Sequence, residues 1–171
     1  SQIELPDGDL LLHSGDFSMN GSLKEVLRFN EDLGEIKHKY KHGIIVIAGN
    51  HDWMAQEDPG LFASLITNAT YLEDSYITID GIKIYGSPWQ PTFFDWAFNL
   101  DRGEAIKAKW DLIPDDIDVL LTHGPPMGIL DVVQNKFSNF APKNVGCEEL
   151  RKKVDSLKNL KLHVFGHLHL S

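Results

Sequence analysis

The sequence contains little cysteine, no long hydrophobic run and little positive charge. Its single cysteine, Cys147, excludes an internal disulfide framework and favours a reducing compartment, so we expect a cytoplasmic protein. No apolar run approaches the roughly 20 residues that a membrane-spanning helix needs, so we expect no membrane partner. With 171 residues and 42% hydrophobic content, the chain can form one domain with its own core.

Positive charge is scarce throughout the chain. The formal net charge is −9, and the arginines are Arg28, Arg102 and Arg151. Proteins that follow a nucleic-acid backbone normally present a basic face, so we do not expect a long nucleic acid as partner. A small phosphate ester or a nucleotide is compatible with this balance, because bound cations can supply a positive field locally. The composition does not indicate an oligomeric state.

Four short apolar runs each end in a small residue followed by a side chain that could bind a metal ion. They are residues 9–13 before Gly-Asp, 43–48 before Gly-Asn-His-Asp, 118–121 before Thr-His-Gly, and 162–165 before Gly-His-Leu-His. Continuous runs of this length, rich in β-branched residues, are typical of buried strands in a sheet covered on both faces. Helical patterns separate them, which predicts an α/β fold with parallel strands.

Local signals add detail to this prediction. Residues 22–25 (Ser-Leu-Lys-Glu) have the form of a helix capping box, and Gly34 is the predicted end of that helix. Residues 58–59 (Asp-Pro) predict the start of a second helix. Alternating apolar residues around Asp-Gly at 80–81 predict a two-residue hairpin, which we expect in a second sheet packed on the first.

The ends of the four apolar runs predict a metal site. In open α/β sheets, ligands lie outside the carboxyl ends of the strands. We therefore expect six side chains to gather there: Asp16, Asn50, His51, His123, His167 and His169. Oxygen and imidazole ligands without thiolate suit divalent ions such as Mn, Fe or Zn. One carboxylate shared by several histidines favours two ions, which can bridge a hydroxide and clamp both the attacking and the leaving oxygen of a phosphoryl displacement.

Each motif taken alone has a structural explanation. Asp and Asn are common turn residues, and an isolated histidine is usually hydrogen-bonded. Unrelated turn residues need not fall at the same end of four strands, and this favours a shared site. His13 and His163 lie within predicted strands, and we expect them to be hydrogen-bonded rather than metal-bound. The aromatic residues between positions 89 and 110 either pack a sheet or covering loop, or stack on a substrate base.

The order of the motifs resembles the calcineurin-like metallophosphoesterases: Gly-Asp, Gly-Asn-His-Asp, His-Gly after an apolar strand, then Gly-His-x-His. The similarity extends from Asp16 to His169. Residues 86–89, 96–99 and 123–126 resemble the metallophosphoesterase-domain-containing (MPPED-type) subgroup. The resemblance implies an α/β sandwich of two β-sheets flanked by helices (α/β/β/α). It also implies a phosphodiesterase that hydrolyses nucleotide-like or cyclic-nucleotide esters through a dinuclear centre with a bridging hydroxide.

The resemblance also implies roles for individual residues. Five would bind metal: Asp16, Asn50, His123, His167 and His169. Asp16 would be the carboxylate that bridges two divalent transition-metal ions, and His169 would serve the ion that the other three residues do not bind. His51 would protonate the leaving oxygen or stabilise its charge. Asp52 would orient His51 through a hydrogen bond.

Two departures from the family pattern refine the prediction. The family's first motif, Asp-x-His, is absent, so we expect residues 1–171 to form a single metallophosphoesterase domain that is incomplete at both ends and lacks its first and last strands. Protein phosphatases of this fold have Asp-Arg-Gly where residues 19–21 read Met-Asn-Gly, so protein phosphatase activity is not expected. Two alternatives stay open: a nucleotide- or phosphate-binding protein with little turnover, and a nuclease, which would need a basic groove.

Overall fold

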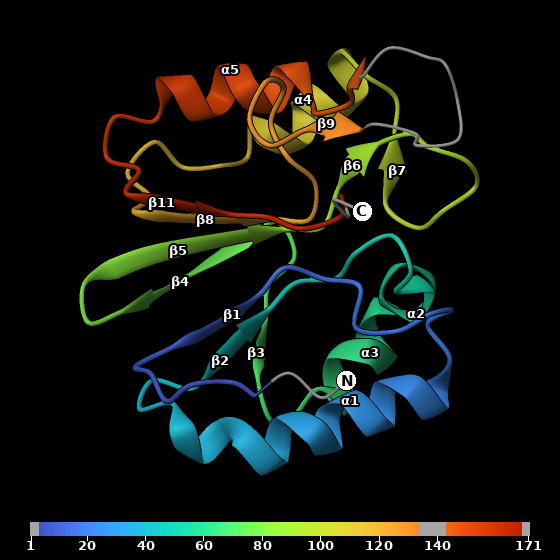
Figure 1. The fold of residues 1–171 in the computed structure, drawn as a ribbon, viewed down its shortest axis with the longest axis vertical. Coiled ribbons are helices and arrows are strands. Elements are labelled where there is room, and N and C mark those ends of the chain that lie inside the picture. Colours follow the sequence, from blue (N-terminus) through green and yellow to red (C-terminus); the bar gives the residue numbers. More distant parts are fainter. Residues whose placement is uncertain (1–3, 134–142, 169–171) are drawn as a thin grey trace.

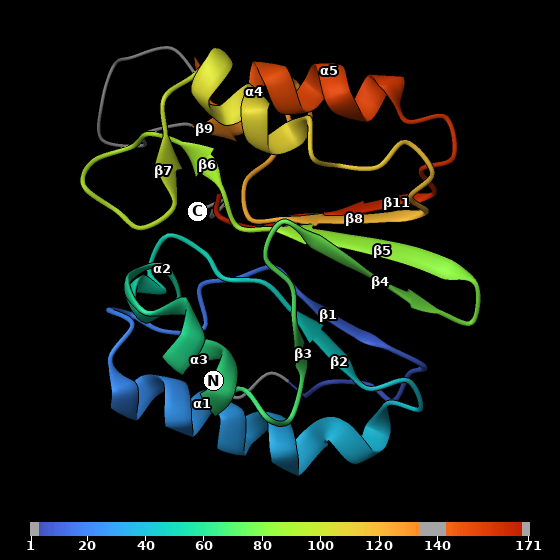
Figure 2. The same cartoon turned by 180° about the vertical axis from the view of Figure 1, so that it is seen from behind.

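The structure, a computed structural model, describes residues 4–133 and 143–168, and its main strands form two sheets (Figure 1, Figure 2). The first sheet is parallel and contains, in spatial order, β1 (Leu11–His13), β2 (Ile44–Val46) and β3 (Thr70–Tyr71). The second contains, in spatial order, β11 (Leu162–Val164), β8 (Val119–Thr122), β5 (Ile82–Ser87) and β4 (Ser75–Ile79). Strand β4 is antiparallel to β5, and the other pairings are parallel.

Helices cover the outer faces of both sheets, which confirms the expected α/β/β/α sandwich (Figure 1). The first sheet is covered by α1 (Leu23–Ile36), α2 (Trp53–Glu57) and α3 (Pro59–Leu65), and a 3-10 turn, η1 (Lys37–Lys39), follows α1. The second is covered by α4 (Glu104–Trp110) and α5 (Glu148–Ser156). Two short ribbons pair β6 (Gln90–Pro91) with β7 (Asn99–Leu100) and β9 (Val132–Val133) with β10 (Lys143–Asn144). Among the described residues, no helix has the length and apolar character needed to cross a bilayer.

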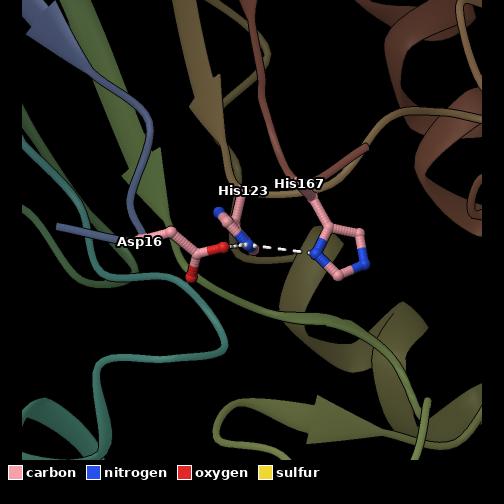
Figure 3. Close-up of side chains that lie close together, drawn as sticks. All are labelled: Asp16, His123 and His167. Carbon is pink, nitrogen blue, oxygen red and sulfur yellow. Dashed lines mark hydrogen bonds and ion pairs between the residues drawn. The ribbon is translucent and has the colours of Figure 1, made fainter. Parts of the chain in front are cut away.

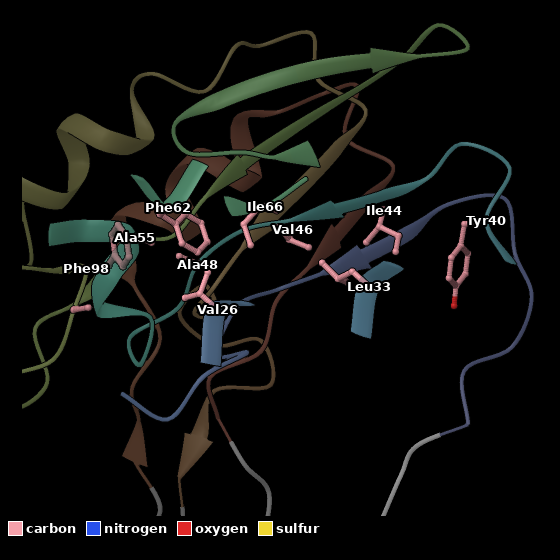
Figure 4. Packing of buried hydrophobic residues seen from close by; sticks show 11 residues of the cluster. Val26, Leu33, Tyr40, Ile44, Val46, Ala48, Ala55, Phe62, Ile66 and Phe98 are labelled. Carbon is pink, nitrogen blue, oxygen red and sulfur yellow. The ribbon is translucent and has the colours of Figure 1, made fainter. Parts of the chain in front are cut away.

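The layers explain why the strand sequences are apolar without interruption. In β2, Ile44 and Val46 pack into the core shared with α1 and α3, which Figure 4 shows. Ile45 and the following Ile47 face the opposite way, into the core between the two sheets. Strand β8 alternates in the same manner between the core beneath α4 and α5 and the core between the sheets. A strand buried on both faces needs an apolar residue at every position.

Several local predictions are confirmed. The Ser22 side chain accepts from the Glu25 amide while the Glu25 side chain accepts from the Ser22 backbone, which completes the capping box. Asp58 caps α3, which has a proline in its first turn. The two residues between β4 and β5 form the predicted hairpin loop, with φ of 48° at Asp80 and 80° at Gly81, as a type I′ turn requires.

Two predictions are wrong. Helix α1 continues through Gly34 to Ile36, and a Cβ at Gly34 would lie 2.9 Å from Nδ2 of Asn68, so a small residue there permits close packing rather than ending the helix. The four apolar runs do not share one sheet, because β1 and β2 lie in the first while β8 and β11 join the hairpin in the second. Hydrophobic patterning reports that both faces of a strand are covered, but it does not select the neighbouring strand.

The two sheets approach each other closely at Gly86 in β5. A Cβ at this position would lie 2.6 Å from Cβ of Leu72 and 2.7 Å from Cγ2 of Ile47. We expect Gly86→Ala to lower the free energy of unfolding by about 1–3 kcal/mol, because the added carbon overpacks the core between the sheets. Urea denaturation measures this change.

The matched control for this prediction is Gly60→Ala in α3. There the nearest atom to an added Cβ is Oδ1 of Asp58 at 3.8 Å. We expect this variant to be neutral or to be stabilised by up to about 1 kcal/mol, since alanine is the better helix former. Equal destabilisation of both variants would show that the sheets are not in tight contact at Gly86.

Candidate metal centre

Three of the predicted metal ligands point toward one another (Figure 3). Asp16 follows β1, His123 follows β8 and His167 follows β11, so both sheets contribute. Nε2 of His123 lies 3.3 Å from Oδ2 of Asp16 and 3.2 Å from Nδ1 of His167. One possible ligand atom from each residue lies within 4.8 Å of those of the other two. The parallel strands of both sheets therefore present their carboxyl ends to a common point.

Asn50, which follows β2, completes this cluster. Its Oδ1 atom lies 2.8 Å from Nε2 of His123 and 2.7 Å from Nδ1 of His167. The structure thus brings together four of the five residues that the sequence predicts as metal ligands. The fifth, His169, lies outside the described residues.

The environment of His123 suits a metal ligand. Its ring is buried, and Nδ1 lies 2.7 Å from the carbonyl oxygen of Ser14. Because a carbonyl oxygen only accepts, Nδ1 carries a proton and donates it to Ser14, which leaves Nε2 as the ring atom that could bind a metal ion. Nε2 faces a carboxylate oxygen of Asp16 and the amide oxygen of Asn50. A cation among these acceptor atoms would satisfy all of them, so the residues present fit a divalent metal ion.

The charge of Asp16 also suits a cation. Burial would raise the pKa of its carboxyl group, but the hydrogen bond with His123 and the bond from the His51 amide outweigh burial, so the pKa lies below its usual value. The His51 amide donates to Oδ1 over 3.0 Å. Asp16 is therefore an ionised carboxylate at neutral pH, which is the form that binds metal.

The backbone around the cluster has little freedom. A Cβ at Gly49 would lie 2.4 Å from Oδ1 of Asp16 and 2.5 Å from Cε1 of His123, so only glycine fits there. Asp16 and His167 themselves have left-handed φ angles of 58° and 69°. Such angles are uncommon for residues other than glycine and tend to occur at functional sites, where surrounding contacts hold them.

The Asp52 carboxylate connects the loops that follow β1 and β2. Its Oδ2 accepts from the amides of Asp16 and Gly49, each over 2.8 Å. Its Oδ1 accepts from the amide and the hydroxyl of Ser18 over 3.1 and 2.7 Å. Burial raises the pKa of Asp52 to about 6, although hydrogen bonds from Ser18 and Gly49 act in the opposite direction. Asp52 thereby fixes the position of the Asp16 backbone.

The expected hydrogen bond between Asp52 and the His51 ring is replaced by a different contact. Nδ1 of His51 lies 2.8 Å from the backbone carbonyl of Met19, which orients the ring. The ring also packs against the indole of Trp96, with 4.4 Å between centroids. Sequence reasoning missed Met19 and Ser14 because any residue can offer a backbone carbonyl, so neither leaves a side-chain signal.

The two strand histidines are hydrogen-bonded, as predicted. Nδ1 of His13 accepts from the Gly15 amide over 3.2 Å, and Nε2 of His163 lies 2.8 Å from Oγ1 of Thr122. Burial lowers the pKa of both rings, to about 4 for His163. His163 is therefore neutral at physiological pH and belongs to the packing of the second sheet.

A two-sheet α/β/β/α sandwich with a carboxylate, an amide and two imidazoles at its strand ends has the architecture of a metallophosphoesterase domain. The chain belongs to the calcineurin-like phosphoesterase family, whose family model matches residues 2–171. The resemblance inferred from the motif order is thereby confirmed. This family is metal-dependent, and the cluster around His123 is a possible metal-binding group.

Named relatives agree with this assignment. Human metallophosphoesterase domain-containing protein 1 is 45% identical over 98% of this chain and 56% of its own length. A UPF0046 protein of Caenorhabditis elegans is 41% identical over 97% of this chain and 47% of its own length. The chain therefore spans about half the length of the curated relatives it matches. A solved crystal structure, 17% identical, matches the fold with a TM-score of 0.58 over 94% of this chain and 73% of its own.

We predict that Asp52→Asn weakens metal binding. The amide nitrogen cannot accept, so two of the four donors around this buried side chain lose their acceptor. We expect the free energy of unfolding to fall by about 1–3 kcal/mol. Because the Asp16 backbone loosens, affinity for Mn²⁺ or Zn²⁺ falls about 10- to 100-fold, as calorimetric titration measures.

The control is Asp58→Asn, at the exposed cap of α3. Asparagine caps a helix about as well as aspartate, so neither stability nor metal affinity is expected to change. An Asp52→Asn protein that is folded and binds metal as tightly as the wild type would contradict the positioning role of Asp52.

Proposed function

We propose that the protein is a metal-dependent hydrolase of small phosphate esters, acting as a phosphodiesterase on nucleotide-like or cyclic-nucleotide substrates. Membership of a metallophosphoesterase family supports the reaction class. The observation that carries the proposal is the buried His123, whose Nδ1 is held by the Ser14 carbonyl while Nε2 faces Asp16 and Asn50. An imidazole fixed in this tautomer among oxygen acceptors is typical of metal ligation.

The cofactors proposed are two divalent transition-metal ions, from among Mn, Fe and Zn. One would be held by the four clustered residues: Asp16, Asn50, His123 and His167. Asp16 would be shared with a second ion, to which the family pattern assigns His169. When bound, such ions supply Lewis-acid polarisation of a phosphoryl oxygen and lower the pKa of water at the site.

His51 is proposed as the general acid for the leaving group. The Met19 carbonyl accepts from its Nδ1–H and so orients the ring, which would leave Nε2 to donate a proton to the departing oxygen. The His51 amide donates to Asp16, which places this histidine beside the proposed metal ligands. Asp52 contributes by holding the Asp16 backbone in position rather than by touching the His51 ring.

A small substrate is favoured over a long or proteinaceous one. The net charge of −9 disfavours a nucleic-acid backbone as partner. Residues 19–21 contain no arginine that could form a bidentate hydrogen bond with a phosphoryl group, which disfavours a protein phosphatase. The bound cations would instead supply the positive charge that holds the ester.

The full-length protein, stripped with a chelator and reloaded with Mn²⁺, Fe²⁺ or Zn²⁺, should hydrolyse bis(p-nitrophenyl) phosphate. His123→Gln should abolish both metal content and turnover, because it removes the central ligand. His51→Gln should retain metal but lower kcat about 10²- to 10⁴-fold, more severely for esters with poor leaving groups. Elemental analysis and steady-state kinetics separate these two effects.

The control variant is His38→Gln, an exposed histidine in η1, which should change neither metal content nor rate. Bound metal without turnover of any ester would refute the hydrolase and favour a phosphate- or nucleotide-binding protein instead. Equal rate losses for good and poor leaving groups in His51→Gln would exclude His51 as the general acid.

A further inference from the structure

The aromatic residues between positions 89 and 110 divide into groups with different surroundings. Phe98 and Trp110 are fully buried, so these two rings pack in the protein core and are not available to stack on a substrate. Phe93 and Phe94 are exposed and contact each other, with ring centroids 4.4 Å apart. Trp96 belongs to neither group, because it is half-buried and lies against the His51 ring. Among these aromatic residues, Trp96 is thus the one that packs against the ring of His51, the proposed general acid.

The backbone holds Trp96 firmly in place. The next residue, Ala97, donates its amide to the carbonyl of Asn50 over 3.1 Å, and the Phe98 amide donates to Oε1 of Gln56 over 2.6 Å. At the other end of the loop, the Asn99 side chain donates to the carbonyl of Phe94 over 2.9 Å. A loop backbone held in this way loses little conformational freedom when a ligand packs on the indole.

We propose that Trp96 determines leaving-group specificity, favouring esters whose leaving group carries an aromatic ring over aliphatic ones of the same size. This inference rests on the proposed function, in which His51 protonates the leaving oxygen. The observation that carries it is the 4.4 Å separation between the Trp96 and His51 ring centroids. Because His51 would protonate the leaving oxygen, the leaving group must depart on the side of the site where His51 and Trp96 are in contact.

Distances support stacking at this place. A leaving oxygen in contact with His51 lies roughly 2.6–3.2 Å from its ring nitrogen. A ring bonded to that oxygen can then reach the roughly 4.5–7 Å range of centroid separations over which aromatic pairs attract. The indole is tilted by 52° to the imidazole, so the two rings are not stacked face to face. Aromatic pairs gain stabilisation beyond what apolar burial provides, which would distinguish a planar ring from a saturated one.

A purely structural role for Trp96 has different consequences. If the indole only orients His51, its loss would lower the rate of hydrolysis of all esters by the same factor, whatever the shape of the leaving group. A stacking role predicts that the ratio between aromatic and aliphatic ligands changes. The decisive quantity is therefore a ratio between two matched ligands rather than a rate.

The test uses the monomethyl esters of benzylphosphonate and cyclohexylmethylphosphonate, in which CH₂ replaces the oxygen between phosphorus and the ring, so that the bond on the ring side is not hydrolysed. Calorimetry gives the Kd of each for the metal-loaded full-length protein. We expect Trp96→Leu to lower the preference for the benzyl ligand over the cyclohexylmethyl ligand by about 2- to 10-fold. Trp96→Phe should retain most of the preference. The ratio of kcat/KM for a phenyl diester to that for a fluoroalkyl diester with the same leaving-group pKa should also fall in Trp96→Leu.

The matched control is Phe94→Leu, which removes a ring from the same loop. Phe94 is 76% exposed and packs on Phe93, so its loss should leave the ligand preference unchanged. A preference that is the same in Trp96→Leu and wild type, with turnover intact, would overturn the inference and leave the hydrolase standing. Absence of turnover with a Trp96-dependent binding preference would support stacking while the proposed hydrolysis fails.

Discussion

A hydrogen bond joins the two sheets at the point where their strands end, from Nδ1 of His123 to the carbonyl of Ser14. His123 follows β8 of the second sheet, and Ser14 follows β1 of the first. The bond fixes the tautomer of the ring and turns Nε2 toward Asp16 and Asn50. If the sheets shifted relative to each other, the imidazole would lose its orientation and the cluster would lose its centre. The proposed chemistry therefore depends on the packing of two layers rather than on any one loop.

Close contact between the sheets continues behind this bond. Gly86 has no room for a Cβ beside Leu72 and Ile47. Gly49 has no room beside Asp16 and His123, so the small residues before the ligands are required by space rather than by a turn alone. The same crowding excludes water from His123, and in such surroundings an ionised carboxylate and a metal ion interact more strongly than they would in solvent.

His123 and His51 are oriented by the same kind of hydrogen bond but differ in burial. Both His123 and His51 present Nδ1 to a backbone carbonyl, at 2.7 Å and 2.8 Å. His123 is buried among acceptor atoms, which suits it to bind a cation. His51 is half-buried beside Trp96, where a substrate could approach Nε2, which suits it to transfer a proton. Burial rather than ring orientation therefore distinguishes the proposed metal ligand from the proposed general acid.

Much of this protein was determined by local sequence. The capping box at Ser22, the proline start of α3 and the Asp-Gly hairpin are set by interactions within a few residues, so the sequence alone predicted them. The α/β class and the convergence of Asp16, Asn50, His123 and His167 followed from apolar runs that end in possible ligands, whereas the α/β/β/α layering was implied by the resemblance of the motif order to a known family.

What tertiary structure decided was pairing between distant segments. The division of the four runs between two sheets, the continuation of α1 through Gly34, and the choice of Met19 rather than Asp52 as the partner of the His51 ring all follow from which segments meet in space. Hydrophobic periodicity and side-chain type do not specify which distant segment becomes the partner. Every residue offers the same backbone hydrogen-bonding groups, both along a strand edge and at a single carbonyl.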